Sequence, residues 1–282
     1  MPFKLVREDL DASKFSPDTF PDDSVVVVDD PFYREDGKKL ILLMFEPECI
    51  KPLQYSTIKN AHRFYRIYTY NEEVLKAVPD RAIRVVGNYT TILPSHYTNT
   101  DISKKEFKIS SWATKVFPGV EGHALRYKAY FSQEFFPKNC VFFRSSHVNP
   151  PMPAINNNPF MGTDFFGGKL CLFETFQFGI QIENSRQLNW FSEKLLDCII
   201  TKTIPIYWGC PNISEFFDTT GWVFFEGVPD LIAKINALTP DYYSKYADVI
   251  EKNYNTALEY ADLYKSFERQ HLIGLNKSVT LI

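Results

Sequence analysis

The chain has 282 residues and a mass of 32.8 kDa, which suits one large domain or two domains of roughly 130–150 residues. Apolar residues make up 45% and charged residues 23% of it, and these ordinary values exclude wholesale disorder, collagen-like and coiled-coil architectures. The 31 Lys and Arg against 34 Asp and Glu give a net charge of −3, which argues against a protein that coats nucleic acid or an anionic membrane surface.

The first half of the chain alternates short apolar runs with polar segments. The run Lys39–Phe45 lies between Gly37 and Pro47 and is almost continuously apolar, as is typical of a strand covered on both faces in a parallel sheet. Other ranges predicted as strands in this half are Val25–Val28, Phe64–Tyr70, Arg81–Val86 and Phe107–Trp112. A helix is predicted over Gly122–Phe135.

A stretch rich in Pro, Asn and Gly lies between residues 149 and 168. Such a composition is typical of a loop or linker. We therefore divide the chain there, into one domain of residues 1–150 and a second of residues 151–282.

Strands and helices alternate more regularly in the second half. The predicted strands are Phe178–Glu183, Ile204–Trp208 and Trp222–Phe225, and the predicted helices are Phe191–Thr201, Ile213–Phe217 and Asp230–Leu238, with mostly helical chain over Pro240–Leu272. Asn189 is expected to cap the helix that follows it. This alternation predicts an α/β fold with crossover connections on a parallel sheet.

The apolar runs are all far shorter than the roughly 20 residues that a membrane-spanning helix needs, and the first residues do not resemble a signal peptide. We therefore expect a cytoplasmic protein without a membrane span. The five cysteines form no CxxC pair, which predicts reduced, buried thiols rather than disulfides.

Polar residues follow the predicted strand that ends at Glu183, and the next helix opens with Ser192, Glu193 and Lys194. Ligands of open α/β sheets bind beyond the carboxyl ends of the strands. The free N–H groups of a helix N-terminus, together with the Lys194 ammonium, suit a phosphate, while the Glu193 carboxylate suits two vicinal hydroxyls such as those of a ribose. The pair therefore predicts a nucleoside diphosphate site, and the alternative is an ordinary solvated first turn.

Three sequence elements occur in order in this half: FGIQIENS from residue 178, WFSEKL from residue 190 and TIPIYWG from residue 203. They resemble the donor-binding signature of the α-1,3-fucosyltransferase family, which runs F-x-x-x-x-E-N-S, Y-V-T-E-K and G-x-V-P-V-x-x-G. Trp190 stands where that family has tyrosine, and Lys202 or Thr203 stands where it has glycine. The same block also resembles the exostosin-type glycosyltransferases, which use UDP-sugars.

The resemblance implies a GT-B-like fold, in which two Rossmann-like domains face each other and residues 1–150 form the acceptor side. Residues 151–282 would then bind the donor and end in helices, one of which, over Tyr254–Leu272, crosses back to the first domain by analogy. It further implies that Glu193 holds the ribose hydroxyls and Lys194 the diphosphate of a nucleotide sugar.

The other donor-side residues that the resemblance implies are Arg126, Lys115 as a weaker second cation, and Glu183, Asn184 and Ser185, which would shape the loop around the donor. Trp190 is a further candidate because its ring can stack on a base or a sugar, although aromatic residues near strand ends more often belong to the core. Because Lys194 and Arg126 can stabilise a departing diphosphate, and no convincing D-x-D occurs, no metal or other cofactor is expected.

Glu46 directly follows a predicted strand of the first domain, a position that suits a general base for the acceptor hydroxyl. The fragment Phe45-Glu46-Pro47 also resembles the M-E-S-P element that contains the family's proposed base, and Glu48 is the competing candidate.

Together these features predict an inverting, metal-independent glycosyltransferase with a GDP-fucose-like donor and a glycan acceptor. The alternatives are an exostosin-like enzyme that uses UDP-xylose or UDP-N-acetylglucosamine, and a non-catalytic module that binds a nucleotide sugar or a glycan.

Overall fold

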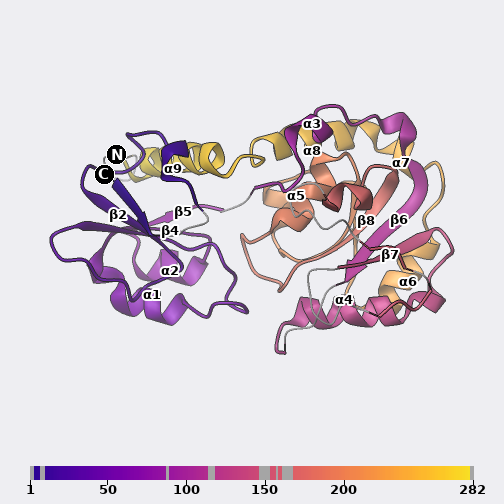
Figure 1. Cartoon of the computed structure of the whole chain (residues 1–282), viewed down its shortest axis with the longest axis horizontal. Helices are drawn as coiled ribbons and strands as arrows, with labels where there is room; N and C mark the ends of the chain where they lie inside the picture. Colours follow the sequence, from indigo (N-terminus) through magenta and orange to yellow (C-terminus); the bar gives the residue numbers. More distant parts are fainter. Residues whose placement is uncertain are drawn as a thin grey trace. The chain divides into compact units, whose positions relative to one another are not determined.

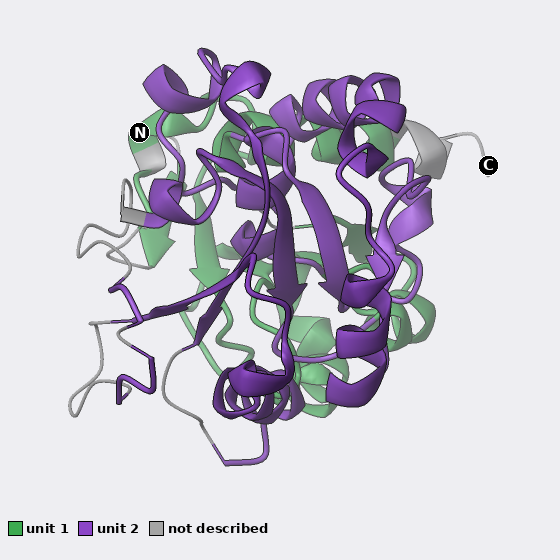
Figure 2. Cartoon of the chain, turned by 90° about the vertical axis from the view of Figure 1, so that its right-hand side faces the viewer, with its two compact units in different colours: residues 1–88, 188–190, 262–282 green, residues 89–187, 191–261 purple. Residues whose placement is uncertain are grey.

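The computed structural model of the chain describes residues 3–6, 10–86, 89–113, 118–145, 153–156, 158–160 and 168–279. The chain divides into two compact units, shown in different colours in Figure 2. The first unit contains residues 1–88, 188–190 and 262–282, and the second contains residues 89–187 and 191–261. The division predicted at residue 150 is therefore wrong, because strands on both sides of that residue belong to one sheet of the second unit.

The first unit contains a parallel sheet whose described strands lie side by side in chain order. Its strands are β1 (Phe3–Val6), β2 (Ser24–Val28), β3 (Lys39–Leu43), β4 (Phe64–Thr69) and β5 (Ala82–Arg84). Its helices are α1 (Gln54–Asn60), α2 (Glu72–Ala77) and α9 (Leu263–Val279), with 3-10 turns η1 (Ala12–Lys14) and η2 (Ala61–Arg63).

Both faces of this first sheet are covered, which explains why its strands β2 and β3 are apolar almost without alternation. Along β2, Val26 and Val28 pack into one core and Val25 and Val27 into the other, because successive side chains of a strand point to opposite faces.

Helix α9, drawn in yellow in Figure 1, covers the face to which Val26 and Val28 point. Its Phe267 packs against Tyr68 of β4, with ring centroids 4.8 Å apart, and its Gln270 exchanges two hydrogen bonds with the backbone of Val86. The expected return of a terminal helix to the first unit is thus confirmed for α9, but the predicted range Tyr254–Leu272 begins inside a separate helix, α8 (Ala247–Leu258), of the second unit.

The second unit contains another parallel sheet, and its described strands lie in the order β10-β9-β8-β6-β7. These strands are β6 (Glu106–Ala113), β7 (Cys140–Arg144), β8 (Phe176–Ile182), β9 (Ile204–Trp208) and β10 (Val223–Phe224). The helices are α3 (Pro94–Tyr97), α4 (Glu121–Phe131), α5 (Glu193–Ile200), α6 (Val228–Asn236), α7 (Tyr242–Lys245) and α8 (Ala247–Leu258). Its 3-10 turns are η3 (Ile102–Lys104), η4 (Gln133–Phe135), η5 (Gly168–Leu172) and η6 (Ile213–Glu215).

The helices of the second unit cover both faces of its sheet. Figure 1 shows α4 and α6 on one side of the strands and α5 and α8 on the other. Residues of α4 and α6 share a core with β8 and β9, and α5 packs against α8. Helices on both faces, with a reversal of strand order in the sheet, make the second unit doubly wound.

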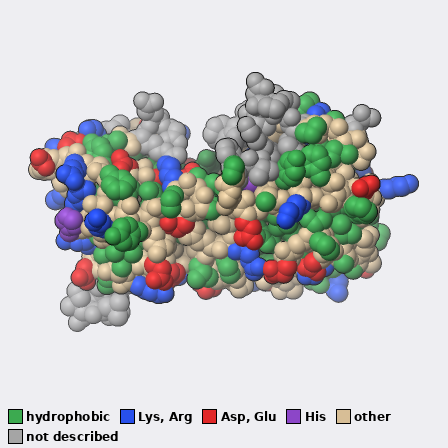
Figure 3. Space-filling view, turned by 90° about the horizontal axis from the view of Figure 1, so that it is seen from below, with side chains coloured by type: hydrophobic (Ala, Val, Ile, Leu, Met, Phe, Trp, Pro, Cys, Tyr) green, Lys and Arg blue, Asp and Glu red, His purple; other side chains and the backbone are tan. Residues whose placement is uncertain are grey.

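All five cysteines are free thiols, as predicted, but only Cys198 and Cys210 are buried, whereas Cys49, Cys140 and Cys171 are partly exposed. Among the described helices, none combines the length and the apolar character needed to cross a membrane. On the face drawn in Figure 3, acidic, basic and apolar side chains are interspersed.

Candidate functional site

The strand order of the second sheet reverses between β6 and β8. β7 lies on one side of β6, whereas β8, β9 and β10 lie on the other. In open α/β sheets the ligand crevice opens beyond the carboxyl ends of the two strands that flank such a reversal. A binding site is therefore expected among the residues that follow β6 and β8.

Glu183 directly follows β8 and is fully buried. Its carboxylate accepts a hydrogen bond from the backbone N–H of Ser192 at 2.8 Å and another from the Ser192 hydroxyl. Burial raises the pKa of Glu183, and the nearby Lys194 charge and the Ser192 hydrogen bonds oppose that rise. Glu183 thus joins the end of β8 to the start of α5, where it can shape the loop between them.

Arg126 of α4 is buried beside that loop. Its guanidinium donates to the Asn184 side-chain oxygen at 2.6 Å and lies 5.6 Å from the centre of the Trp112 ring, near the carboxyl end of β6. Helix α4 can approach this closely because residue 122 is glycine. A Cβ atom there would lie 1.7 Å from the backbone oxygen of Glu183, which a folded chain does not tolerate without a shift of the backbone.

The first turn of α5 is largely buried. Ser192, and not the predicted Asn189, is the N-cap, and its hydroxyl accepts the backbone N–H of Lys194. The Lys194 ammonium lies 3.0 Å from a Glu193 carboxylate oxygen and 3.2 Å from the Ser192 hydroxyl, while only 9% of its side chain is exposed. The alternative of a solvated first turn is therefore wrong for Lys194.

A second ammonium, that of Lys169 in η5, reaches the same carboxylate. It lies 3.3 Å from Glu193 and 3.4 Å from Asp197 one turn further along α5. Two threonines fix Asp197 in turn. The Thr90 hydroxyl and the Thr91 backbone N–H both donate to the same Asp197 carboxylate oxygen, each at 2.7 Å.

These contacts determine the charge of Glu193. Burial alone raises the pKa of Glu193, but the ammonium groups of Lys194 and Lys169 overcome that effect and hold the pKa well below its usual range. Since 22% of its side chain is still exposed, Glu193 is an ionised carboxylate that can accept hydrogen bonds from a ligand.

The turn that contains Glu46 lies at the carboxyl end of β3 in the first unit. The backbone N–H of Phe45 donates to a buried Asp29 oxygen at 2.8 Å, and that of Glu46 donates to the same atom at 3.4 Å. The Tyr70 hydroxyl donates to the Glu46 backbone oxygen at 2.7 Å, and the Trp190 indole N–H donates to the Phe45 backbone oxygen at 3.0 Å. The backbone of the turn is therefore fixed on several sides.

The contacts of Trp190 differ from those expected of a donor-binding residue. Its indole is buried and it belongs to the first unit, whereas Lys194 belongs to the second. Asn189 has a positive φ of 58°, and its amide donates to Glu72 of the first unit at 2.6 Å. A contact between Trp190 and a donor stays a prediction.

Glu48 is engaged in the structure of the same loop. Its carboxylate accepts the backbone N–H of Gln54, at the start of α1, at 3.0 Å, and the Asn71 amide at 3.4 Å. Partial burial raises the pKa of Glu48, and these hydrogen bonds oppose the rise. Glu48 therefore serves the start of α1, and the choice between Glu46 and Glu48 as the base stays a prediction.

The remaining predicted residues have different outcomes. Lys115 lies outside the described residues. Ser185 lies in the loop after β8, and its buried hydroxyl makes no hydrogen bond within the described part of the chain. Three or more His, Cys, Asp or Glu side chains do not gather as a potential metal site among the described residues, and independence from metal stays a prediction.

Sequence reasoning missed Lys169, Asp197, Trp112 and Asp29. A signal was present for two of them. Asp197 is an acidic residue inside the apolar helical run Leu195–Ile200, and Asp29 directly follows the predicted strand Val25–Val28. Lys169 lies in a segment without apolar periodicity, 24 residues before Glu193, so only the fold brings the two together.

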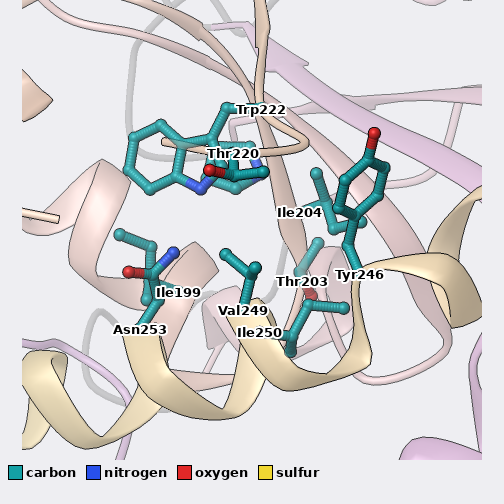
Figure 4. Close-up of a pocket in the computed structure, with 10 residues that line it drawn as sticks. Ile199, Thr203, Ile204, Thr220, Trp222, Tyr246, Val249, Ile250 and Asn253 are labelled. Atoms are coloured by element: carbon teal, nitrogen blue, oxygen red, sulfur yellow. The ribbon is translucent and has the colours of Figure 1, made fainter. Parts of the chain in front are cut away.

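A pocket in the second unit lies elsewhere (Figure 4). It is lined mainly by apolar side chains of α5, α8 and the start of β9, among them Ile199, Ile204 and Ile250, and by Trp222, which directly precedes β10. Because this is the amino end of β9, the pocket lies at the edge of the sheet opposite to the carboxyl ends of the strands and is separate from the charged cluster.

Known proteins resemble this chain in part of its sequence and in its fold. No family model matches the chain, but the α-(1,3)-fucosyltransferase FucT of Helicobacter pylori is 26% identical over 108 residues, which are 37% of this chain and 22% of that protein. The resemblance to the α-1,3-fucosyltransferases is confirmed. The matched region spans only about a fifth of the length of this relative.

Solved structures show the fold. An α1,3-fucosyltransferase with GDP-fucose superposes with a TM-score of 0.50 at 15% identity, covering 88% of this chain and 78% of that one. Alr3699/HepE of Anabaena, in complex with UDP-glucose, superposes with a TM-score of 0.59 at 10% identity, covering 91% of this chain and 79% of that one. The predicted GT-B-like α/β fold is thus confirmed.

Proposed function

We propose that the chain is an inverting, metal-independent glycosyltransferase that moves a sugar from a GDP-fucose-like donor to a glycan hydroxyl. The observation that supports this function best is the buried cluster of Lys194, Lys169 and Glu193 at the start of α5, beside the strand-order reversal between β6 and β8. Likeness to an α1,3-fucosyltransferase with GDP-fucose supports the same choice of donor.

Donor binding would use the two kinds of charge in this region. The Lys194 ammonium and the Arg126 guanidinium would contact the diphosphate, together with N–H groups at the start of α5. The ionised Glu193 carboxylate would accept hydrogen bonds from the two ribose hydroxyls. Asn184 would orient Arg126, to which it is hydrogen-bonded.

Transfer would then be a single displacement. Glu46 accepts the proton of the acceptor hydroxyl, whose oxygen forms a bond to the anomeric carbon of the sugar. The bond between that carbon and the diphosphate oxygen breaks on the opposite side, and the nucleoside diphosphate departs with the electron pair. One displacement inverts the anomeric centre, whereas retention would need a second, nucleophilic carboxylate.

Negative charge grows on the diphosphate as this bond breaks, so cations that are already in place lower the barrier most. Lys194 and Arg126 are buried, and buried charges interact more strongly than exposed ones. These two residues would therefore do the work that a bound divalent cation does in metal-dependent transferases.

A thermal-shift panel with GDP, UDP and ADP tests the proposal. A nucleotide that binds the folded chain raises the melting temperature, and at a hundred times its Kd it adds about 2.7 kcal/mol to the free energy of unfolding. We expect GDP to stabilise the chain more than UDP or ADP does. The proposal is wrong if neither GDP nor UDP raises the melting temperature.

A UDP-sugar donor is the second candidate, and the likeness to HepE with UDP-glucose favours it. In the same panel it predicts a larger shift with UDP than with GDP. A non-catalytic binding module is the third candidate, and it predicts nucleotide binding without release of GDP or UDP from any nucleotide sugar in the presence of glycan acceptors.

A further inference from the structure

Lys169 is a buried lysine that the proposed reaction does not yet use. Only 5% of its side chain is exposed. Its ammonium lies between the carboxylates of Glu193 and Asp197 and 5.8 Å from the centre of the Trp112 ring. Burial lowers the pKa of Lys169, but the charges of Glu193 and Asp197 outweigh burial and raise it. The residue is therefore a fixed positive charge.

Glu193 thus has two cationic partners, Lys194 at 3.0 Å and Lys169 at 3.3 Å, which both contact its Oε1 atom. In the proposed function Lys194 contacts the donor diphosphate. The lysine ammonium has three N–H donors in one compact head group. When it turns toward a diphosphate, the diphosphate and the neighbouring carboxylate share these donors, and the contact with the carboxylate is partly lost. Without another cation, the buried Glu193 carboxylate would then lose its charge partner, which is costly.

We propose that Lys169 is a positioning residue, which keeps Glu193 ionised and oriented toward the ribose hydroxyls while Lys194 contacts the diphosphate. This inference rests on the proposed function. It divides the labour between two lysines that touch the same carboxylate: Lys194 binds the donor, and Lys169 acts only through Glu193.

The surroundings of Lys169 suit that role. Asp197 is fully buried, and its carboxylate lies 3.4 Å from the Lys169 ammonium. Thr90 and Thr91 in turn hold Asp197 through both a hydroxyl and a backbone N–H. Lys169 is therefore anchored independently of any ligand, as a residue that orients another side chain must be.

A purely structural role is the competing explanation, in which Lys169 only neutralises Asp197 inside the second unit. The two roles differ in what they do to nucleotides that lack ribose hydroxyls. If Lys169 acts through Glu193, its loss weakens binding of GDP but leaves binding of 2′,3′-dideoxy-GDP unchanged. If its role is structural, its loss weakens the binding of both nucleotides by the same factor.

The test measures the Kd of the full chain for both nucleotides by calorimetry, with the uridine pair in place of the guanosine pair if the wild type prefers UDP. Lys169→Met is expected to raise the Kd for GDP about tenfold, the scale of one charge-assisted contact, and to change the Kd for dideoxy-GDP less than about twofold. Lys169→Arg, which keeps the charge, is expected to restore most of the GDP affinity. Lys234→Met, which removes an exposed lysine paired with Asp230, is the matched control.

Each outcome decides between the possibilities. Equal losses for GDP and dideoxy-GDP overturn the role of Lys169 and leave the proposed function intact. A wild type that binds neither GDP nor UDP overturns both. If the methionine variant does not fold, Lys169→Gln, which keeps an N–H donor for Asp197 without the charge, takes its place with the same expected pattern.

Discussion

The two charged regions of this chain are built in different ways. In the first unit, the backbone of the turn at Glu46 is fixed by hydrogen bonds from Tyr70 and Trp190 and to Asp29. In the second unit, the side chains at the start of α5 are fixed by ion pairs among Lys169, Glu193 and Lys194. Hydrogen bonds thus fix the backbone at Glu46, whereas ion pairs fix the charged side chains at the start of α5.

The sheets beneath these regions differ in the same sense. The strands of the first sheet follow chain order, whereas the order of the second sheet reverses between β6 and β8. A reversal sends the connections after two neighbouring strands to opposite faces and leaves a crevice between them. The second unit therefore combines this strand-order reversal with the buried cations Lys194 and Arg126, whereas the first unit has a carboxylate on a turn whose backbone is hydrogen-bonded on several sides.

Removing the carboxylate charge at Glu46 is expected to have the largest effect. Glu46→Gln should lower kcat by about 10²- to 10⁴-fold, the contribution of a general base, because the amide cannot accept the acceptor proton. The Kd for GDP should stay close to that of the wild type, since donor binding is proposed for the second unit. Initial rates of nucleotide release and calorimetry measure the two quantities.

Glu48→Gln is the matched control for that variant. Its amide oxygen can still accept the backbone N–H of Gln54, so both the fold and kcat should change little. If kcat instead falls in Glu48→Gln and stays unchanged in Glu46→Gln, the general base is Glu48 and not Glu46.

Neutralising Lys194 is expected to have the next largest effect, on binding rather than on the base. Lys194→Met should raise the Kd for the nucleoside diphosphate by about 10- to 100-fold, because a hydrogen bond to a charged group contributes about 1.5–3 kcal/mol. Lys234→Met, on the exposed side of α6, should leave the Kd unchanged. An unchanged Kd in Lys194→Met would contradict the proposed contact between the Lys194 ammonium and the diphosphate.

Much of the fold could be predicted from local sequence. The strand Ile204–Trp208 was predicted with the bounds of β9, because its apolar run ends sharply at Gly209. Helix α2 was missed although its signal is local: the Asn71 side chain accepts the backbone N–H groups of Glu73 and Val74 as an N-cap. The return of the terminal helix followed only from the family resemblance, and the assignment of residues 188–190 to the first unit could not be predicted, since it depends on contacts between segments far apart in the chain.

The candidate site divides along the same line. Glu193 and Lys194 are neighbours in the sequence at a helix start, so their pairing could be predicted from the sequence. The contact of Glu193 with a second cation could not be predicted, because Lys169 comes from a different loop. Asn189 looked like a helix cap from its position, but it has a positive φ and contacts Glu72 of the first unit, and Ser192 caps the helix instead.

Lys105 is a second buried lysine of the second unit, and unlike Lys169 it has neutral hydrogen-bond partners. It directly precedes β6, and its ammonium donates to the Phe173 backbone oxygen at 2.8 Å and to the Thr203 hydroxyl at 2.7 Å. Burial lowers the pKa of Lys105 from 10.5 to about 7, with weaker opposing effects of Cys198 and Glu174. Its hydrogen-bond partners in the described part of the chain are neutral, so burial dominates its pKa, whereas two carboxylates outweigh burial at Lys169.

This difference predicts how stability depends on pH. Between the lowered pKa of Lys105, about 7, and its value of 10.5 in the unfolded chain, the unfolded state binds more protons than the folded state. The free energy of unfolding should therefore rise with pH in this window, by about 1.4 kcal/mol per pH unit at most. Urea denaturation from about pH 7.5 to about pH 9 measures the slope, and Lys105→Met should flatten it, whereas Lys234→Met should not. An equal slope in Lys105→Met and the wild type would mean that the folded chain keeps Lys105 protonated. Burial would then not lower the pKa of Lys105 below that of Lys169.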